Sequence, residues 1–300
     1  MAGSSAGRPR KGYGLNSFRG FYFKQATADD ALSLIAATGQ GAGGRRFASI
    51  QVVLPEAAFT VPFPVEEARL EPAGPSVHFG ENRLDASGMK VDLRGGGHEV
   101  CGELIFGPLS RPRGDIMGPF GLLPGLECRH RLVSMAHEVR GMLSVDGRER
   151  RFDGALGYIE GDSGRSFPKS YLWTQVFSPG GEPRSVMLSV AEIPCAGLRF
   201  TGILGFALLD DREIRLATYL RARVVEIADG CVTVRQGGYT LTVEFDLGPS
   251  TALEAPVNGV MTREIGERLS GRARYCMTLD GRVLFDFLSE NASFEYEYAR

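Results

Sequence analysis

The stretch Gly141–Glu160, GMLSVDGRERRFDGALGYIE, carries the clearest sign of the fold. It contains the dipeptide Asp146-Gly147, and Asp-Gly favours the tightest β-hairpin turns because both residues accept a positive φ angle. On either side, apolar and polar residues alternate in short runs, as they do along a strand with one buried face. We therefore predict two antiparallel strands joined at this dipeptide.

The same alternation recurs along most of the chain, punctuated by 40 glycines and 16 prolines. Further turns are predicted at Asp210-Asp211, Gly237-Gly238 and Asp280-Gly281. Strand-like runs occupy residues 21–25, 47–54, 89–95, 99–106, 186–193, 206–219, 231–247 and 271–298. The predicted class is mostly antiparallel β, arranged as barrels or sandwiches.

Two segments also allow helices. Residues 27–37 fit a helix capped by Thr27 or Asp29, but fit a strand equally well. Residues 258–271 place Met261, Ile265 and Leu269 four apart, which predicts a short amphipathic helix.

The bulk composition sets limits on function. The 300 residues allow one large β domain or two ordinary ones, and we predict a tail at 1–12 without order, a first β lobe at 13–165 and a second at 166–298. The formal net charge is −2, from 34 basic and 36 acidic side chains, so no basic excess favours nucleic acid. We find no secretory signal and no apolar run long enough for a membrane-spanning helix.

The cysteines and histidines give no metal or disulfide pattern. The five cysteines (Cys101, Cys128, Cys195, Cys231 and Cys276) are far apart and never form a CxxC pair. Free thiols in a reducing cytoplasm are the expected state, and no metal or cofactor is expected.

The segment Gly157–Gln175, GYIEGDSGRSFPKSYLWTQ, gathers acids, a guanidinium and aromatics. On an extended chain Glu160 and Asp162 point to the same side, and residues 162–165 have the composition of a turn. Arg165 could pair with either acid and close a loop. Alternatively, one acid is partly desolvated and donates a proton, since burial keeps a carboxyl group protonated near neutral pH.

A second polar cluster lies in residues 126–141. On a strand, Glu127 faces one side with Arg129 and Arg131, while His130 faces the other side with Cys128. A strand that is polar on both faces suits a lobe with a ligand in its interior. His130 is then a candidate acid or base, and a purely structural role for this histidine is an equally good interpretation.

Two other features suggest a cavity. Phe167, Tyr171 and Trp173 belong to an aromatic cluster that is either core or the wall of a site for an apolar ring or a transient cation. Residues 106–125 are rich in proline and glycine but too apolar for a linker, so we expect a lid packed on the β structure.

These segments resemble the tocopherol cyclase family. The resemblance rests on FRGFYFKQ at 18–25, DIMGPFGLLPGLECRHRLVSMAHEVRG at 115–141, FDGALGYIEGDSGRSFPKSYLWTQ at 152–175 and LEAPVNGVMTREIGERL at 253–269. It implies two lipocalin-like antiparallel β lobes around an apolar cavity. It also implies a cofactor-free reaction in which a prenyl double bond is protonated and a neighbouring phenol oxygen traps the cation, closing a chromanol ring.

The resemblance assigns expected roles. Asp162 or Glu160 would be the acid, and His130 would handle the phenolic proton. Trp173 and Tyr171 would face the cation, and Arg165, Glu127 and Phe167 would complete the substrate site. Where the family usually has an aromatic residue, this chain has Ser163, which would leave the acid wetter.

Two functions follow as hypotheses. The first is a tocopherol cyclase-like enzyme (cyclase, isomerase or, if water traps the cation, hydratase) acting on a hydrophobic prenylated aromatic. The second is a lipocalin-like protein that binds an apolar ligand without chemistry. For either, we expect a cytoplasmic protein that is able to touch a membrane surface through Ile116, Met117, Phe120 and Leu122. The sequence leaves the oligomeric state open.

Overall fold

The computed structural model describes residues 16–123, 125–181, 184–195 and 198–298. The tail predicted at 1–12 lies outside these residues. Within them every long element is a β-strand and no α-helix forms; the four short 3-10 turns are η1 (Ala42–Gly44), η2 (Val65–Glu67), η3 (Gly118–Leu122) and η4 (Thr218–Leu220). The mostly antiparallel β class is confirmed.

The first sheet uses the strands up to Gly164. It contains β1 (Ser17–Ala26), β2 (Ala31–Gln40), β3 (Arg46–Val53), β4 (Ala58–Pro62), β5 (Ala68–Leu70), β6 (Val77–Phe79), β7 (Asn82–Asp85), β8 (Gly88–Gly95), β9 (His98–Phe106), β10 (Cys128–Val145), β11 (Arg148–Arg151) and β12 (Ala155–Gly164). Its order is β4-β3-β2-β1-β12-β10-β9-β8-β7-β6-β5, with β11 paired to β10. The sheet curls until β4 approaches β8. Its edge strands do not pair with each other, so the lobe is not a closed barrel.

The second sheet begins at Tyr171. It contains β13 (Tyr171–Val176), β14 (Ser185–Cys195), β15 (Leu198–Leu209), β16 (Arg212–Ala217), β17 (Arg223–Ala228), β18 (Cys231–Gln236), β19 (Tyr239–Phe245), β20 (Thr251–Val257), β21 (Val260–Leu279) and β22 (Arg282–Tyr296). The order is β16-β15-β14-β13-β22-β21-β19-β18-β17, with β20 paired to β21. This sheet is also open.

The hairpin predicted at Asp146-Gly147 is confirmed. Val145 pairs with Arg148, so β10 and β11 are joined by these two residues alone. Asp146 has a φ of 52° and Gly147 a φ of 76°. Two successive positive φ values give a turn whose twist matches that of the flanking strands.

The helix predicted over residues 258–271 is wrong, because β21 runs through it. Ile265, Glu267 and Leu269 are buried while their immediate neighbours are more exposed. A spacing of four is also a multiple of two, so the apolar positions fit a strand as well as a helix. Residues 27–37 likewise take the strand alternative, in β2.

The turn predicted at residues 162–165 is also wrong in position. β12 continues to Gly164, and Asp162 pairs with Gly20 of β1 and with His130 of β10. Pairing on both sides holds these residues extended despite their turn-like composition.

Each lobe has its own apolar core. In the first lobe the core includes Phe23, Ile50 and Phe152, and in the second it includes Leu188 and Tyr275, all of them almost fully buried. Burying such side chains contributes about 25 cal/mol per Å² of apolar surface.

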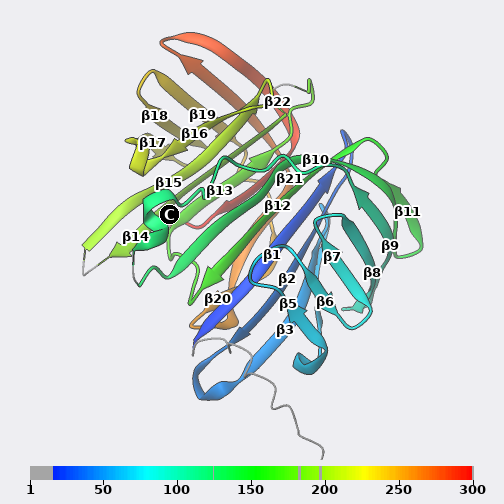
Figure 1. Ribbon diagram of the computed structural model, residues 1–300. Helices are drawn as coiled ribbons and strands as arrows, with labels where there is room; N and C mark the ends of the chain where they lie inside the picture. The colour runs from blue at the N-terminus through cyan, green and yellow to red at the C-terminus, as the bar shows by residue number, and fades with distance from the viewer. Residues whose placement is uncertain (1–15, 124, 182–183, 196–197, 299–300) are drawn as a thin grey trace, which may run out of the picture.

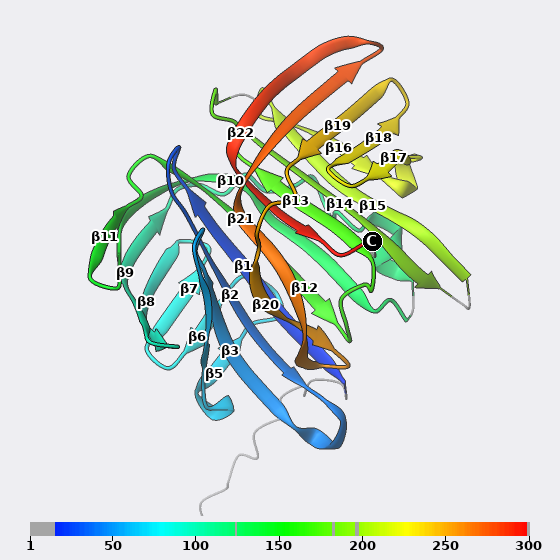
Figure 2. The same ribbon diagram turned by 180° about the vertical axis from the view of Figure 1, so that it is seen from behind.

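The lobes lie side by side and share a third buried layer. In both views β1, β10 and β12 of the first sheet lie next to β13, β20 and β21 of the second (Figures 1 and 2). Tyr22, Leu132, Tyr158, Trp173 and Phe206 are buried in this layer. It contains side chains from both sheets, so any site there depends on both lobes.

The segment expected to be a lid spans the two lobes. It leaves the first lobe after β9 and forms η3, the green coil near β14 (Figure 1). Arg215 of the second lobe donates hydrogen bonds to the carbonyl oxygens of Arg113 and Asp115, and the Tyr219 hydroxyl donates to that of Ile116. The lid is therefore fastened to β16 and η4.

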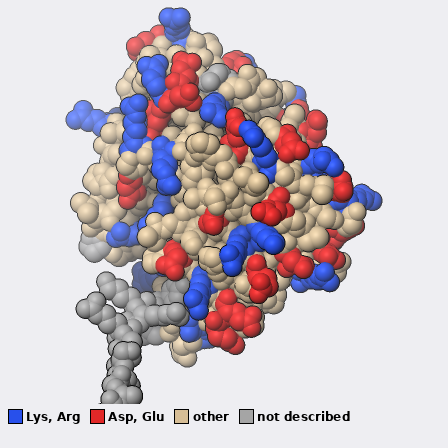
Figure 3. All heavy atoms as spheres, turned by 45° about the vertical axis from the view of Figure 1, so that its right-hand side comes forward, with Lys and Arg blue, Asp and Glu red and all other residues tan. Residues whose placement is uncertain are grey.

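The surface carries mixed charge. On the face in Figure 3, basic and acidic side chains are interspersed and do not gather into a patch of one sign. Among the described residues, no helix is long and apolar enough to cross a membrane.

Candidate active site

A pocket opens between the two lobes and encloses about 1260 Å³ of free space, part of it open to solvent. Strands of both sheets and the lid contribute to its wall. Its aromatic lining consists of Phe18, Phe21, Tyr22, Phe120, Phe167, Tyr171, Trp173 and Phe200. The polar groups in this wall are few, which is the usual composition of a site for a small apolar molecule.

Strand register places the polar groups in two facing rows. In the first sheet Tyr22 of β1 is directly opposite Glu160 of β12. In the second sheet Trp173, Glu295 and Glu267 follow one another across β13, β22 and β21. Residues directly opposite on neighbouring strands share a face of the sheet.

Two hydrogen bonds join the rows. The Trp173 Nε1–H donates to Glu160 Oε2 over 3.2 Å, and the Tyr22 hydroxyl donates to Glu267 Oε1 over 2.7 Å. Each bond runs from one lobe to the other. The two lobes therefore hold each other's carboxyl groups in place.

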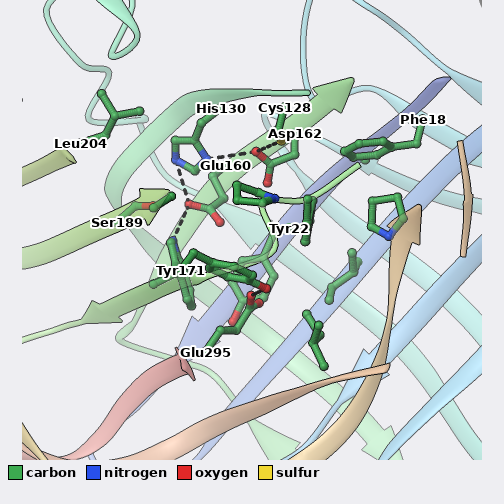
Figure 4. A pocket seen from close by; sticks show the side chains of 18 of the residues that line it. Phe18, Tyr22, Cys128, His130, Glu160, Asp162, Tyr171, Ser189, Leu204 and Glu295 are labelled. Carbon is green, nitrogen blue, oxygen red and sulfur yellow. Dashed lines mark hydrogen bonds and ion pairs between the residues drawn. The ribbon is translucent and has the colours of Figure 1, made fainter. Parts of the chain in front are cut away.

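His130 lies between two carboxyl groups at the pocket wall (Figure 4). Its Nδ1 is 3.2 Å from Asp162 Oδ1, and its Nε2 is 3.3 Å from Glu160 Oε2. The first contact is a hydrogen bond; the second has the distance of an ion pair but not the alignment of a hydrogen bond. We call His130, Glu160 and Asp162 the histidine cluster.

The histidine carries a proton in this setting. Burial alone would lower the pKa of His130, but the neighbouring Glu160 and Asp162 raise it well above the ordinary value. The cluster is then an imidazolium between two carboxyl groups. The hydroxyl of Tyr158 also donates to Glu160 Oε2, and burial, followed by the charge of Glu160, raises the pKa of that hydroxyl.

The cluster is also the group of described residues that best resembles a metal site, since its donor atoms lie within 4.8 Å of one another. Each ring nitrogen of His130 already faces one carboxyl group. To coordinate an ion together with both carboxylates, the ring would have to turn away from one of them. The present arrangement suits a shared proton better than a cation.

Cys128 completes this side of the pocket. Its thiol is 3.5 Å from Asp162 Oδ1. Burial, followed by the charge of Asp162, raises its pKa well above the ordinary value, so it is a neutral thiol. Cys101, Cys231 and Cys276 are also free.

A second cluster of polar side chains lies beside the histidine cluster. We call Glu267 and Glu295 the glutamate pair, and Tyr22 and Tyr171 are the tyrosines that donate hydrogen bonds to it. The Tyr171 hydroxyl donates to Glu295 Oε2 over 2.5 Å. Glu267 is fully buried, and its Oε2 has no hydrogen-bond partner among the described residues. Tyr22, Tyr171 and Glu295 line the pocket.

Lys24 is a cation that attracts Glu267 of this pair. It is fully buried, and its Nζ donates to the carbonyl oxygen of Gln175 over 3.3 Å. Burial lowers its pKa to about 7, against the attraction of Glu267. Burial likewise raises the pKa of Glu267 to about 7, against the hydrogen bond from Tyr22.

Six of the eight side chains predicted for the site line this pocket: Asp162, Glu160, His130, Trp173, Tyr171 and Phe167. Arg165 and Glu127 are not among the lining residues. Arg165 is exposed, and its backbone N–H donates to the carbonyl oxygen of Glu127, which fixes the chain after β12. Glu160 and Asp162 share a face of β12, as their spacing predicted.

Ser163 is turned away from the pocket. It shares a face of β12 with Gly161 and Ile159, toward the first lobe's own core, and pairs with Arg19 and Arg129. An aromatic residue at this position would not stand beside the Asp162 carboxyl group.

Four residues at or beside the pocket were not predicted as site residues: Tyr22, Lys24, Glu267 and Glu295. One signal was present, because Glu267 stands between Ile265 and Leu269 at a position that a strand would bury. Because residues 258–271 were predicted to be a helix, this signal was not used.

Comparison with known proteins supports the fold. No protein-family model and no curated protein matches the chain. Among solved structures, a protein from Nitrosomonas europaea provisionally named AttH is similar over 100% of this chain and 99% of its own, with a TM-score of 0.51 and 11% identity. Kievitone hydratase from Nectria haematococca is similar over 94% of this chain and 89% of its own, with a TM-score of 0.50 and 11% identity. At this identity the likeness shows a shared two-lobed β fold.

Proposed function

We propose that this protein is an enzyme that protonates a carbon–carbon double bond of an apolar substrate and lets an oxygen atom trap the resulting cation. With a phenol on the same molecule the product is a ring, as in the tocopherol cyclase family that the sequence resembles. With water the product is an alcohol. The observation that carries this proposal is the histidine cluster at the wall of an otherwise apolar, aromatic-lined pocket.

The chemistry requires three things of the site. A donor gives a proton to one alkene carbon, an acceptor takes the proton from the attacking oxygen, and the pocket stabilises a cation between these steps. The histidine cluster, with one imidazolium and two carboxyl groups, is suited to exchange protons and to attract a cation. The faces of Tyr171 and Trp173 add to that attraction.

Asp162 and Glu160 are the donors that the sequence predicted, and both lie in this cluster. His130 was predicted to take the proton of the oxygen. Since His130 itself holds a proton, the cluster would accept that proton as a unit, through a carboxylate next to the imidazolium.

The fold of kievitone hydratase is consistent with the water-trapping version, since that protein's name denotes the addition of water. Ring closure and hydration share the first step and differ in which oxygen reaches the cation. We propose ring closure of a prenylated aromatic as the leading reaction, because the pocket carries many aromatic rings and the sequence resemblance indicates it.

A non-catalytic binding protein for an apolar ligand is the second candidate. The same aromatic pocket favours it. It requires no role for the histidine cluster beyond holding the lobes together.

Contact with a membrane surface remains part of the proposal in altered form. Of the four lid residues expected to make it, Ile116 and Met117 are buried, whereas Leu122 is 86% exposed. Phe120 lines the pocket. Leu122 is therefore the residue that would enter a lipid surface.

The proposal is tested by incubating the purified protein with a panel of phenols and hydroquinones that carry prenyl chains. A product of unchanged mass indicates ring closure, and a product heavier by one water indicates hydration. We expect Glu160→Gln to lower kcat/KM by about 100-fold or more, and Glu138→Gln, an exposed change on the His130 strand, to leave it unchanged.

The fluorescence of Trp173, the chain's single tryptophan, reports ligand binding in the same experiment. Tight binding of panel members without either product would refute the enzyme proposal and favour the binding protein.

A further inference from the structure

The second group of carboxyls in the pocket has a geometry that the histidine cluster lacks. Glu267 and Glu295 are directly opposite on β21 and β22. The Cβ atoms of such a pair lie about 4.5–5.5 Å apart on one face of the sheet. Besides burial, the charge of Glu267 therefore opposes ionisation of Glu295 and raises the pKa of that carboxyl group.

No histidine separates this pair, and its charged surroundings are mostly negative. From the first sheet, Lys24 attracts Glu267, while Glu160 repels both members of the pair. Asp162 also repels Glu295. The positive charge of His130 does little to stabilise ionised Glu267 or Glu295, because it is already paired with Glu160 and Asp162.

The guanidinium of Arg263 lies 5.9 Å from the centre of the Tyr171 ring. That arginine forms its ion pair with Glu297 at 2.7 Å. It is therefore already neutralised. Burial, followed by the charge of Glu267, raises the pKa of Glu295 well above the ordinary value.

Access distinguishes the two members of the pair. Glu267 is fully buried, whereas Glu295 is partly buried and lines the pocket beside Trp173. In Figure 4 the side chains of Glu295 and Tyr171 lie at the opposite end of the site from His130 and Asp162. The Glu295 carboxyl group thus faces the cavity at one end and the histidine cluster lies at the other.

We propose that Glu295, held neutral by Glu267 and hydrogen-bonded by Tyr171, is the acid that protonates the alkene. This inference rests on the function proposed above and assigns its first step. The sequence-based alternative places that step at Asp162 or Glu160.

The step is balanced as follows. The O–H bond of Glu295 breaks and its proton forms a C–H bond with one alkene carbon, while the π electrons form that bond and leave a cation at the other carbon. The phenol or water oxygen then forms the C–O bond, and its proton passes to the histidine cluster. Tyr171 stabilises the Glu295 carboxylate until the histidine cluster releases its extra proton and Glu295 takes one up, through the pocket or solvent.

This assignment also gives a substrate class. The alkene must lie beside Glu295 and Trp173, and the attacking oxygen must lie toward His130. A prenylated phenol fits if its ring oxygen is at the histidine end and its chain at the Glu295 end.

Infrared spectroscopy of the full chain labelled with ¹³C-glutamate tests the protonation state without a substrate. We expect a protonated glutamic acid band at neutral pH in the unchanged protein and in Glu264→Gln, an exposed change on the Glu267 strand. Glu267, with its pKa of about 7, also contributes to the band at neutral pH, so Glu295→Gln should weaken the band clearly without abolishing it. A band of unchanged strength in Glu295→Gln overturns the proposal.

Turnover tests the role. Glu295→Gln should lower kcat at least about 100-fold while Trp173 fluorescence still reports substrate binding. Full activity in Glu295→Gln, with activity lost in Asp162→Asn, assigns the step to the histidine cluster instead. If the unchanged protein turns over no panel member, the proposed function fails, whereas the infrared result still decides whether the pair holds a proton.

Glu267→Gln adds a pH test that does not depend on removing the donor. Activity needs protonated Glu295, so it is lost as pH rises through the pKa of that group. Without its like-charged neighbour Glu295 ionises more easily, so the loss should move to lower pH by about one unit or more. An unmoved profile contradicts the proposal.

Discussion

The pocket contains two pairs of carboxyl groups that are chemically alike and differently surrounded. Glu160 and Asp162 lie on one strand with the ring of His130 between them. Glu267 and Glu295 lie on neighbouring strands with no such ring. In the first pair a cation compensates the charge, and in the second pair protonation removes it. Neighbours, and not residue type, decide whether a buried glutamate is a base or an acid.

The largest effect on stability is expected when the cation between Glu160 and Asp162 is removed, because this pair would then lack an imidazolium between its carboxyl groups, as the pair of Glu267 and Glu295 does. His130→Ala leaves Glu160 and Asp162 without compensation, so we expect the free energy of unfolding at neutral pH to fall by about 3–5 kcal/mol. Urea unfolding measures it. His98→Ala is the matched control, because it removes an exposed ion pair with Asp146 at 2.8 Å and should cost much less. Equal losses in the two variants would contradict the comparison.

The second largest effect is expected in the pH dependence of the free energy of unfolding, where the glutamate pair should behave differently from Glu160 and Asp162. Glu267 has a pKa of about 7 in the folded protein against 4.5 ordinarily, so between these values the folded state binds more protons than the unfolded state. The free energy of unfolding therefore falls as pH rises through this window. Glu267→Gln should remove the part of this decline that Glu267 causes, roughly 3 kcal/mol, and leave the part that Glu295 causes, because the pKa of Glu295 is raised as well.

The control for that measurement is Lys24→Met, whose effect lies in a different window. Lys24 has a pKa of about 7 when folded against 10.5 ordinarily, so the unfolded state binds more protons between these values. Stability should rise with pH there in the unchanged protein, and Lys24→Met should flatten that rise. If Glu267→Gln leaves the decline below neutral pH undiminished, Glu267 does not cause it.

Loss of the hydrogen bond from Trp173 to Glu160, which joins the two lobes, should have a smaller effect on stability. Trp173→Phe keeps an aromatic ring and removes the N–H that donates to Glu160 Oε2. We expect a loss of about 1–2 kcal/mol in the free energy of unfolding, the usual cost of leaving a buried acceptor without a donor. Tyr158→Phe removes a second side-chain donor to the same oxygen, the Tyr158 hydroxyl. The double variant should lose more free energy of unfolding than the sum of the two single variants. Strict additivity would mean that the donors act independently.

These contrasts show what the sequence could and could not predict. Glu160, Asp162 and His130 were found because two of them are two apart on one strand and the third stands in a strand with polar residues on both faces. Glu267 and Glu295 were missed because their meeting depends on the register of β21 with β22. That register follows from the packing of the second lobe and from bulges such as the shift between Arg268 and Gly271.

The fold was predicted more fully than the site for the same reason. Alternation and Asp-Gly turns are local, so Asp146-Gly147 specifies its hairpin without help from the rest of the chain. A tertiary contact such as Tyr22 to Glu267, 245 positions apart in sequence, leaves no local pattern. The error at residues 258–271 arose where a local pattern fitted two periods.

The smallest effect on activity is expected at Ser163, where the sequence alone suggested a large one. An aromatic residue there was expected to keep water from the neighbouring acid, but Ser163 faces away from the pocket and pairs with Arg19 and Arg129. Ser163→Trp should therefore leave kcat/KM and the pH profile within about twofold. Because Ser163 is half-buried on the face toward the first lobe's core, the larger ring should cost about 1–3 kcal/mol in the free energy of unfolding. The control is Gly161→Trp on the same face, where even a Cβ atom would lie 2.6 Å from the Phe21 ring, so this change should destabilise strongly. A gain in activity on Ser163→Trp would mean that a ring at this position does exclude water from the first carboxyl pair, and would return the donor role to Asp162.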